Sequence, residues 1–526
     1  MAEREWLALL DDCAAALERS GARGWLVGGC LRDVLLGRAA PDPGSVAVDV
    51  DVVVTGDPLA LARVLAPRGV PALSVARLGP GHGTVRVVRA GTPAQGGWQL
   101  DIGALRGPTI EADLLARDFT INALALPLAA RALLGGWLER GGPVAEADSA
   151  QVVDPSGGRR DAHQRVLRAA SATALVDDPL RVVRGARLAG ALDLALDART
   201  VARARVAATA LGGVARERVG SELRALLALP ALPAAVRAVA HLATLGAQPV
   251  VLPELGSSAT PDSTTGSFAH ARQTLVTLES APEAIVRRAP AGAAEWLRAE
   301  LDVWLAQPLA SGRTRALALR WAALLHGLDE PSETSTGMAS AAELAGRASQ
   351  DLAAPAIVAV CRRLGLAPRE RDLVRAVARG QRPARALVAD GEGRDGGTGS
   401  ALDELAARRW FARAGTAGVE TLVVAVACAR ASVRAGTAAH GSADALARRA
   451  ARLLAVFFAA RERVLPAPLV DGDLLMRELG LRAGPDLGRV LAGVRAAQIE
   501  GAVATREAAL RLARTLSGQA AGSDDV

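Results

Sequence analysis

Hydrophobic and polar residues alternate along four short stretches near the start of the chain. They read WLVGG (25–29), VDVDVVV (48–54), TVRVV (84–88) and WQLDIGAL (98–105). A period of two is typical of a β-strand, in which successive side chains point to opposite faces. The stretch at 1–20 and the segments between the strands show helical spacing instead. Residues 1–145 are therefore expected to combine strands and helices.

After residue 145 this alternation fades, and apolar residues recur at spacings of three and four in segments rich in Ala, Leu and Arg. Such spacing predicts helices. Two low-complexity stretches, GSSATPDSTTGS (256–267) and DGEGRDGGTGS (390–400), indicate joints between segments. We expect an α+β fold with a head that contains a small sheet, followed by three helical parts, with boundaries at 1–145, 146–235, 236–395 and 396–526.

Composition narrows the function. The chain has 526 residues and a net charge of +7, and it contains no Lys, so all 62 basic residues are Arg. The absence of Lys excludes a P-loop lysine and Schiff-base catalysis, while the positive charge favours a polyanionic partner. Four cysteines without paired spacing indicate reduced thiols. The charged N-terminus does not resemble a signal peptide, and no apolar run of about 18 residues is apparent. A cytoplasmic protein that does not span a membrane is expected.

The stretch DVDVVV places Asp49 and Asp51 two positions apart, so both carboxylates project from one face of a strand. Like charges so close repel each other unless a cation lies between them. Asp101, in the strand QLDIGALR, could complete a cage of three carboxylates, a set that suits Mg²⁺. A solvated strand face is the alternative interpretation of the two aspartates.

The stretch LVGGCLRDVLLGR predicts a strand that turns at Gly28 and Gly29 into a helix that carries Arg32 and Asp33. Paired glycines allow close approach of a phosphate, and a helix N-terminus offers free N–H groups to an anion. The glycines could equally serve packing between strand and helix.

The stretch ARDFTINALAL places Arg117, Asp118 and Asn122 at the start of an expected apolar helix. Asp118 could be a plain N-terminal helix cap, a position that Asp favours.

In DDPLRVVRGARLAG, four charged residues recur every three positions: Asp178, Arg181, Arg184 and Arg187. They could form a ladder of surface ion pairs on a helix. They could also read bases, because cytosine and adenine both show an amine beside a ring-nitrogen acceptor. A carboxylate that accepts from the amine and an Arg that donates to the ring nitrogen would fit C and A and reject G and U.

The order of these motifs resembles the class II tRNA nucleotidyltransferases, that is, the CCA-adding enzymes and their bacterial poly(A) polymerase relatives. The resemblance covers residues 30–230, including VVDPSGGRRDAHQRVLRA (152–169) and ARERVGSELRALL (215–227), and also 469–510 near the end. It implies a palm-like head of the polymerase-β type that binds Mg²⁺ and NTP. It also implies neck, body and tail helices that hold tRNA.

The resemblance also implies roles for single residues. Asp49 and Asp51 match the metal-binding carboxylates, and Asp101 matches the third catalytic carboxylate. The matching nucleotide-binding positions are Gly28, Gly29, Arg32, Asp33, Arg117, Asp118, Asn122, Asp178, Arg181, Arg184 and Arg187. Within this set, Asp178 and Arg181 match the pair that reads the base.

The helical middle resembles the HD metal-phosphohydrolase pattern in SFAHARQTLVTLE and LRWAALLHGLDEP. His270 and His326 stand where two of its histidines would be, but Gly327 replaces the aspartate that follows the second one. Because that carboxylate is a metal ligand in such hydrolases, we predict a scaffold without hydrolase activity.

The resulting hypothesis is a Mg²⁺-dependent, template-independent enzyme that adds C, A or both from CTP and ATP to the 3′ end of tRNA. A poly(A) polymerase acting on other RNA and a catalytically inactive RNA-binding protein remain alternatives. The expected partners are tRNA, ATP and CTP, and no membrane or obligate protein partner is expected. No motif decides whether CC, A or the whole CCA is added.

Overall fold

The computed structural model describes residues 2–38, 48–66, 73–77, 83–89, 98–140, 142–256, 267–310, 312–328, 355–389 and 400–521. Of the predicted joints at 256–267 and 390–400, residues 257–266 and 390–399 lie outside the described residues. Two compact units divide the chain: Met1–Glu222 with Arg237–Val251, and Leu223–Val236 with Leu252–Val526. The division into head, neck, body and tail is finer than these two units and stays a prediction.

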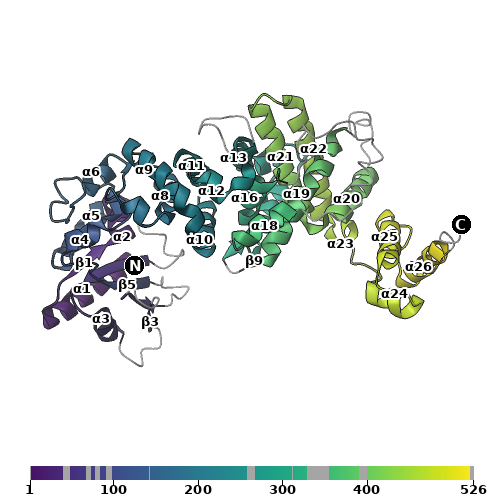
Figure 1. The fold of residues 1–526 in the computed structure, drawn as a ribbon. Coiled ribbons are helices and arrows are strands. Elements are labelled where there is room, and N and C mark those ends of the chain that lie inside the picture. Colours follow the sequence, from purple (N-terminus) through teal and green to yellow (C-terminus); the bar gives the residue numbers. More distant parts are fainter. Residues whose placement is uncertain are drawn as a thin grey trace. The chain divides into compact units, whose positions relative to one another are not determined.

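One mixed sheet of six strands organises the start of the first unit (Figure 1). Its strand order is β3 (Leu73–Arg77), β4 (Val85–Arg89), β5 (Trp98–Ala104), β2 (Val48–Val54), β1 (Gly24–Val27) and β6 (Ala125–Pro127). Only β2 and β5 run parallel, and the other neighbours are antiparallel. The four predicted strands are confirmed, whereas β3 and β6 were not predicted from the sequence.

Alternation along the two central strands places apolar residues on one face of the sheet. Val50, Val52, Leu100 and Ile102 are at most 1% exposed, and they share a core with Trp6 and other residues of α1 (Ala2–Ser20). Burying side chains of this size stabilises the fold by about 1.5–3 kcal/mol each relative to their exposure. The acidic positions of the same strands consequently face the other way.

Short helices complete this part of the chain. They are α2 (Gly28–Leu35), α3 (Pro58–Leu65), α4 (Ile110–Leu115), α5 (Ala132–Arg140) and the 3₁₀ turns η1 (Thr120–Asn122) and η2 (Leu128–Ala130). The apolar helix expected after Asn122 is wrong, because the chain leaves η1 and enters β6, which pairs with β1. Edge-strand pairing here outweighs the helical propensity of an Ala- and Leu-rich segment.

The rest of the first unit is mainly helical. It holds α6 (Gly158–His163), α7 (Ala174–Asp177), α8 (Leu180–Leu192), α9 (Ala198–Ala208), η3 (Thr209–Gly213), α10 (Arg216–Leu227), which extends into the second unit, α11 (Leu232–Thr244) and α12 (Gln248–Val251). A short parallel pair, β7 (Val166–Leu167) with β8 (Ala195–Leu196), departs from the expected all-helical part. Such two-residue pairs are too short to show as alternation in a sequence.

The DPSGG motif forms the N-terminus of α6. The Asp154 carboxylate accepts hydrogen bonds from the backbone N–H groups of Gly157 and Gly158, at 2.8 and 2.7 Å. A Cβ on Gly158 would overlap the carbonyl oxygen of Thr120 in η1. The motif therefore allows α6 to pack tightly against the turn that carries Asn122.

In the described residues of the second unit, the strands are the two-stranded pair β9 (Pro308–Ala310) and β10 (Arg313–Thr314), and the other elements are helices. Its helices are α13 (Ser267–Leu278), α14 (Ala281–Val286), α15 (Ala294–Ala306), α16 (Arg315–Leu325), α18 (Pro355–Arg363), α19 (Pro368–Ala389), α20 (Ser400–Ala414), α21 (Gly418–Arg434), α22 (His440–Ala459) and α23 (Arg461–Val464). The 3₁₀ turns η4 (Pro253–Leu255) and η6 (Gly415–Ala417) belong to it as well. Three further helices, α24 (Gly472–Leu479), α25 (Pro485–Glu500) and α26 (Arg506–Ala521), share an apolar core of their own.

One stretch of the second unit is long and apolar enough, on average, to be compared with a membrane span. Residues 404–434 contain an 18-residue window whose mean hydropathy of 1.4 would suit a membrane span, by length and composition alone. In the fold, 72% of the most apolar window lies buried inside the protein, chiefly in α21. A helix that is apolar on all sides is also what the centre of a helical bundle requires. Its hydrophobicity is explained by packing within the second unit.

Candidate active site

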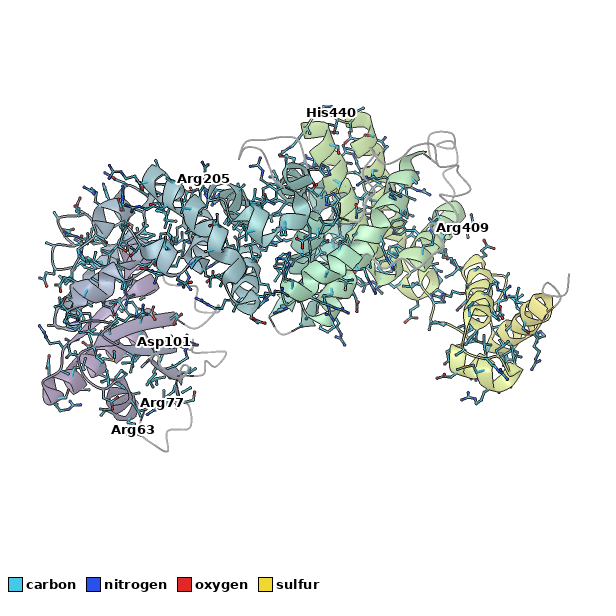
Figure 2. All side chains as sticks on the ribbon, in the orientation of Figure 1. Arg63, Arg77, Asp101, Arg205, Arg409 and His440 are labelled. Carbon is cyan, nitrogen blue, oxygen red and sulfur yellow. The ribbon has the colours of Figure 1, made fainter. Side chains whose placement is uncertain are left out.

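The two central strands bring the three predicted carboxylates together. In the parallel pairing of β2 with β5, Asp51 lies opposite Asp101 and Asp49 lies opposite Gln99. One carboxylate oxygen from each aspartate lies within 4.8 Å of the others. Asp101 is on the strands of the head in Figure 2, and the Gln99 amide donates to Asp49 at 3.0 Å. The cluster arises because both strands place their acidic positions on the face opposite the core.

Burial and mutual repulsion both disfavour the charged form of the central carboxylate in this cluster. Burial, followed by the charges of Asp49 and Asp101, raises the pKa of Asp51 from 3.8 to about 6. Like charges on neighbouring carboxylates disfavour ionisation unless a cation compensates them. Oxygen donors of this kind suit a hard divalent ion. The donor set therefore fits a metal ion, although it does not by itself identify which one.

Arg86 is a site residue that sequence reasoning missed. It lies opposite Asp101 in the antiparallel pairing of β4 with β5, and its guanidinium donates to both oxygens of Asp101 at 2.7 Å. Bidentate pairs of this kind are strongly oriented. The signal in the sequence was the alternation in TVRVV, which places Arg86 on the polar face of its strand. Arg86 fixes the direction of the Asp101 carboxylate.

The turn at Gly28 determines where Asp51 can point. Gly28 has φ of +76°, in the left-handed region, and a Cβ there would lie 3.2 Å from Asp51 Cγ and closer still to Oδ2. Only glycine combines this backbone conformation with so close an approach. The structure thus shows a packing role for Gly28 against a site carboxylate. Gly29 lies beside the Arg32 guanidinium.

A polar network extends from α2 through η1 towards α8. Arg32 donates to Asp33 at 2.9 and 3.0 Å and to the Asn122 side chain at 2.9 Å. Asn122 donates to Asp118 at 3.1 Å, and Asp118 also accepts from Arg184 at 3.5 Å. Asp118 is only 8% exposed. Five predicted nucleotide-binding residues are therefore linked by hydrogen bonds in one continuous series: Asp33, Arg32, Asn122, Asp118 and Arg184.

Glu222 continues this network and was not predicted. Its carboxylate accepts from Arg184 at 3.2 Å and from Arg187 at 2.9 Å, so it holds two of the predicted arginines on α8. Arg184 and Arg187 project side by side because they are three residues apart on a helix. Glu222 lies in ARERVGSELRALL, on α10, and no local pattern connects it with α8.

Asp178, Arg181 and Arg117 have other partners. Asp178 precedes α8 with extended backbone rather than lying on it, and it forms an ion pair with Arg218 at 2.9 Å. The helical Asp178–Arg181 pair expected from their spacing is therefore wrong as a local contact. Arg181 donates to the carbonyl oxygens of Ala116 and Ala174 at 3.0 Å and of Arg117 at 3.2 Å.

The Arg117 side chain has a partner outside this network, and its charge partly offsets the rise in the pKa of Asp51. Arg117 pairs at 3.1 Å with Asp113, a fully buried carboxylate in the first turn of α4. Asp113 also accepts from the backbone N–H of Arg106. Asp113 was not predicted, because nothing in its neighbourhood distinguishes it from an ordinary helix residue.

We expect Asp51→Asn to stabilise the metal-free protein, with an effect that depends on pH. The raised pKa means that the folded state favours the neutral carboxyl, so wild-type stability falls as pH rises from 3.8 through about 6. Removing the charge should raise the free energy of unfolding by about 3 kcal/mol at pH 7.5 and by little near pH 4. Urea unfolding in the presence of EDTA measures this.

The exposed ion pair between Asp148 and Arg140 provides the control for this variant. Asp148→Asn should change stability by less than about 1 kcal/mol. An equal gain from Asp51→Asn at both pH values would show that charge repulsion is not the cause.

Comparison with known proteins shows similarity over the head. Residues 24–168 match the model of the poly A polymerase head domain. Residues of this chain are 39% identical over 224 positions to a CC-adding tRNA nucleotidyltransferase of Geobacter sulfurreducens, covering 42% of this chain and 45% of the relative. An A-adding tRNA nucleotidyltransferase of Deinococcus radiodurans is 29% identical over 453 residues, covering 82% of this chain and 86% of the relative.

Similarity to a solved structure extends over nearly the whole chain. A structure of a CCA-adding enzyme in its apo form superposes with a TM-score of 0.56 at 18% identity, covering 97% of this chain and 93% of that one. Identity this low supports the fold alone. The match spans less than half the length, 45% and 46%, of the first two curated relatives.

Proposed function

Because residues 24–168 of this chain match the model of the poly A polymerase head domain, we propose that the protein transfers CMP, AMP or both from CTP and ATP to the 3′ end of tRNA without a template. The observation that carries this proposal is the convergence of Asp49, Asp51 and Asp101 beside the turn at Gly28. The matched relatives, which are named as CC-adding and A-adding tRNA nucleotidyltransferases, support it.

In the proposed reaction, the 3′-hydroxyl oxygen of the RNA forms a bond to the α-phosphorus of the nucleotide. The bond between the α-phosphorus and the oxygen bridging to the β-phosphate breaks, the hydroxyl loses its proton, and pyrophosphate leaves. Mg²⁺ held by Asp49 and Asp51, with Asp101 as third ligand, would supply charge neutralisation at the phosphate and lower the pKa of the attacking hydroxyl.

The remaining residues of the network are proposed to position the nucleotide. Arg32 carries a positive charge at the turn that follows β1, and Asp33 and Asn122 hold its side chain in place. Because the guanidinium is already oriented before a nucleotide binds, it would lose little conformational freedom when it contacts the triphosphate. Asp118 and Glu222 hold Arg184 in the same way. Arg86 keeps the Asp101 carboxylate oriented.

The helices outside the head are proposed to hold tRNA. The chain has a net charge of +7, and its basic residues are all Arg, which pairs well with phosphate. Contacts with the RNA backbone would make affinity fall as salt concentration rises. We also propose a cytoplasmic location, which agrees with four cysteines that are all free thiols.

The decisive test supplies purified protein with tRNA transcripts that lack CCA, lack only the terminal A, or are complete, and gives each NTP separately. The proposal predicts incorporation of CMP, AMP or both, stopping at the mature end. Repeated AMP addition to unrelated RNA would instead indicate a poly(A) polymerase. Binding of tRNA with no incorporation of any nucleotide would leave an RNA-binding protein.

Base selection by Arg181 provides a further prediction. Its three hydrogen bonds to backbone carbonyls use three of five N–H donors, so donors remain for the ring nitrogen of C or A. Arg181→Ala should lower the preference for CTP and ATP over UTP and GTP by roughly 1–3 kcal/mol, or about 5–150-fold. The measurement is the ratio of kcat/KM values for the four nucleotides.

Arg205→Ala is the matched control, because Arg205 also donates to a backbone carbonyl, that of Thr244, from the surface of α9 (Figure 2). It should leave base selection unchanged. If Arg181→Ala lowers only thermal stability while all four ratios stay constant, Arg181 is a structural residue and the base-reading assignment fails.

A further inference from the structure

Three side chains with nitrogen and sulfur donors converge inside the second unit. His270 lies on α13, His326 follows the last residue of α16, and Cys428 lies on α21. One ligand atom from each residue lies within 4.8 Å of those of the other two. The centroids of the two imidazole rings are 5.3 Å apart. These residues are distant in the sequence, and only the packing of the three helices brings them together.

The tautomer of His326 is determined by its surroundings. Its Nδ1 lies 2.9 Å from the backbone carbonyl oxygen of Ala323. Since a carbonyl oxygen can only accept, Nδ1 must carry the proton, and in the neutral ring Nε2 then carries the lone pair. Metal-binding histidines typically donate their other ring N–H to a carbonyl in this way, which fixes the ring for coordination.

The helices hold the three residues firmly. Thr277 on α13 donates through its hydroxyl to the carbonyl of Ala427 on α21, at 2.7 Å, directly beside Cys428. Cys428 and His326 are each 2% exposed, whereas His270 is only half-buried. The cluster therefore combines a rigid interior with one side through which an ion could enter.

We propose that His270, His326 and Cys428 form a binding site for a zinc-class transition-metal ion. Imidazole nitrogen and thiolate sulfur are donors that zinc prefers over magnesium. A tetrahedral zinc ion would hold such atoms about 3.3–3.6 Å apart, given bond lengths of about 2.0–2.3 Å. The ligand atoms lie within 4.8 Å of one another, so the proposed ion would draw them closer together, with the fourth ligand position left for water.

The chemistry of this site differs from that of the three carboxylates in the head. Gly327 follows His326, where metal phosphohydrolases of the resembling pattern carry a carboxylate. The proposed ion would therefore join α13, α16 and α21 and stabilise the second unit. The sequence-based prediction that this region has no hydrolase activity remains untested and is compatible with such a role.

Cobalt substitution tests the proposal, because only thiolate ligation produces a charge-transfer band from sulfur to Co²⁺ in the near ultraviolet. Titration of the full-length, metal-free protein with Co²⁺ should produce this band at one equivalent, and Zn²⁺ should abolish it. Cys428→Ser should remove the band. His270→Gln should weaken Zn²⁺ affinity by more than about 10–100-fold, which is the loss typical when a residue that only hydrogen-bonds to a metal ligand is replaced. Oxygen-only binding at the carboxylates of the head gives no such band.

Two cysteine variants are matched controls. Cys361→Ser changes another buried thiol of the second unit, and Cys30→Ser changes the thiol near the carboxylates of the head. Because the proposed ion stabilises the second unit, Zn²⁺ should raise the melting temperature of the wild-type protein. Both control variants should keep this rise and the charge-transfer band. A wild-type protein without the band, or a band that persists in folded Cys428→Ser, would overturn the proposal. Should Cys428→Ser fail to fold, retention of full zinc affinity by His270→Gln would overturn it equally.

Discussion

Replacing either Asp49 or Asp51 with Ala should reduce nucleotide transfer by about 10³-fold or more while the fold and tRNA binding are retained. Both carboxylates project from β2 on the face opposite the core, so their loss leaves the buried Val50 and Val52 in place. Metal-assisted stabilisation of transition-state charge contributes several kcal/mol, and about 1.4 kcal/mol corresponds to a tenfold change in rate. Single-turnover incorporation at saturating Mg²⁺ measures the loss.

Asp148→Ala is the control for this experiment, because Asp148 is a surface carboxylate that pairs with Arg140. It should retain wild-type rates. Near-normal incorporation by Asp49→Ala or Asp51→Ala would rule out the assignment of these carboxylates as metal ligands, whatever the activity of the wild-type protein.

Gly28→Ala should lower kcat by about 10²-fold, even though it adds only a single methyl group. The new Cβ would overlap Asp51 Oδ2, so the carboxylate must rotate out of the three-carboxylate cluster. Displacements of about 1 Å at a catalytic group are sufficient for losses of this size. The loss should appear in kcat and in Mg²⁺ dependence, with KM for tRNA unchanged.

Gly21→Ala is the control that distinguishes steric overlap with Asp51 from backbone strain at a glycine with positive φ. Gly21 has φ of +70°, close to the +76° of Gly28, but a Cβ there meets no atom within 4 Å. Both substitutions should therefore destabilise the protein by about 1–2 kcal/mol through the left-handed backbone. Only Gly28→Ala should impair transfer. Equal activity in the two variants would refute the role of Gly28 in directing Asp51.

Several features of the site lay beyond any local pattern. Arg86 was visible as a polar position in an alternating strand, but its partner Asp101 depends on the pairing of β4 with β5. Glu222 binds Arg184 and Arg187 across helices that are far apart in the chain. The spacing of Asp178 and Arg181 was misleading, because Pro179 lies between Asp178 and the first residue of α8.

By itself, the sequence determined which residues share a face of one element. A strand has a period of two, so the alternation in 48–54 and 98–104 was enough to place Asp49 and Asp51 together and to put Asp101 on the polar side of its own strand. It also determined the turn of β1 into α2 at paired glycines. Such features depend on covalent geometry and on neighbours a few residues away.

Tertiary structure alone decided which elements meet. The parallel pairing of β2 with β5 sets Asp51 opposite Asp101, and the packing of α13, α16 and α21 brings Cys428 to His270 and His326. The role of Gly28 also depends on tertiary structure, because the side chain that packs against it is the carboxylate of Asp51. Contacts of this kind arise from burying apolar faces of separate elements against one another, and that free energy depends on the whole packed chain.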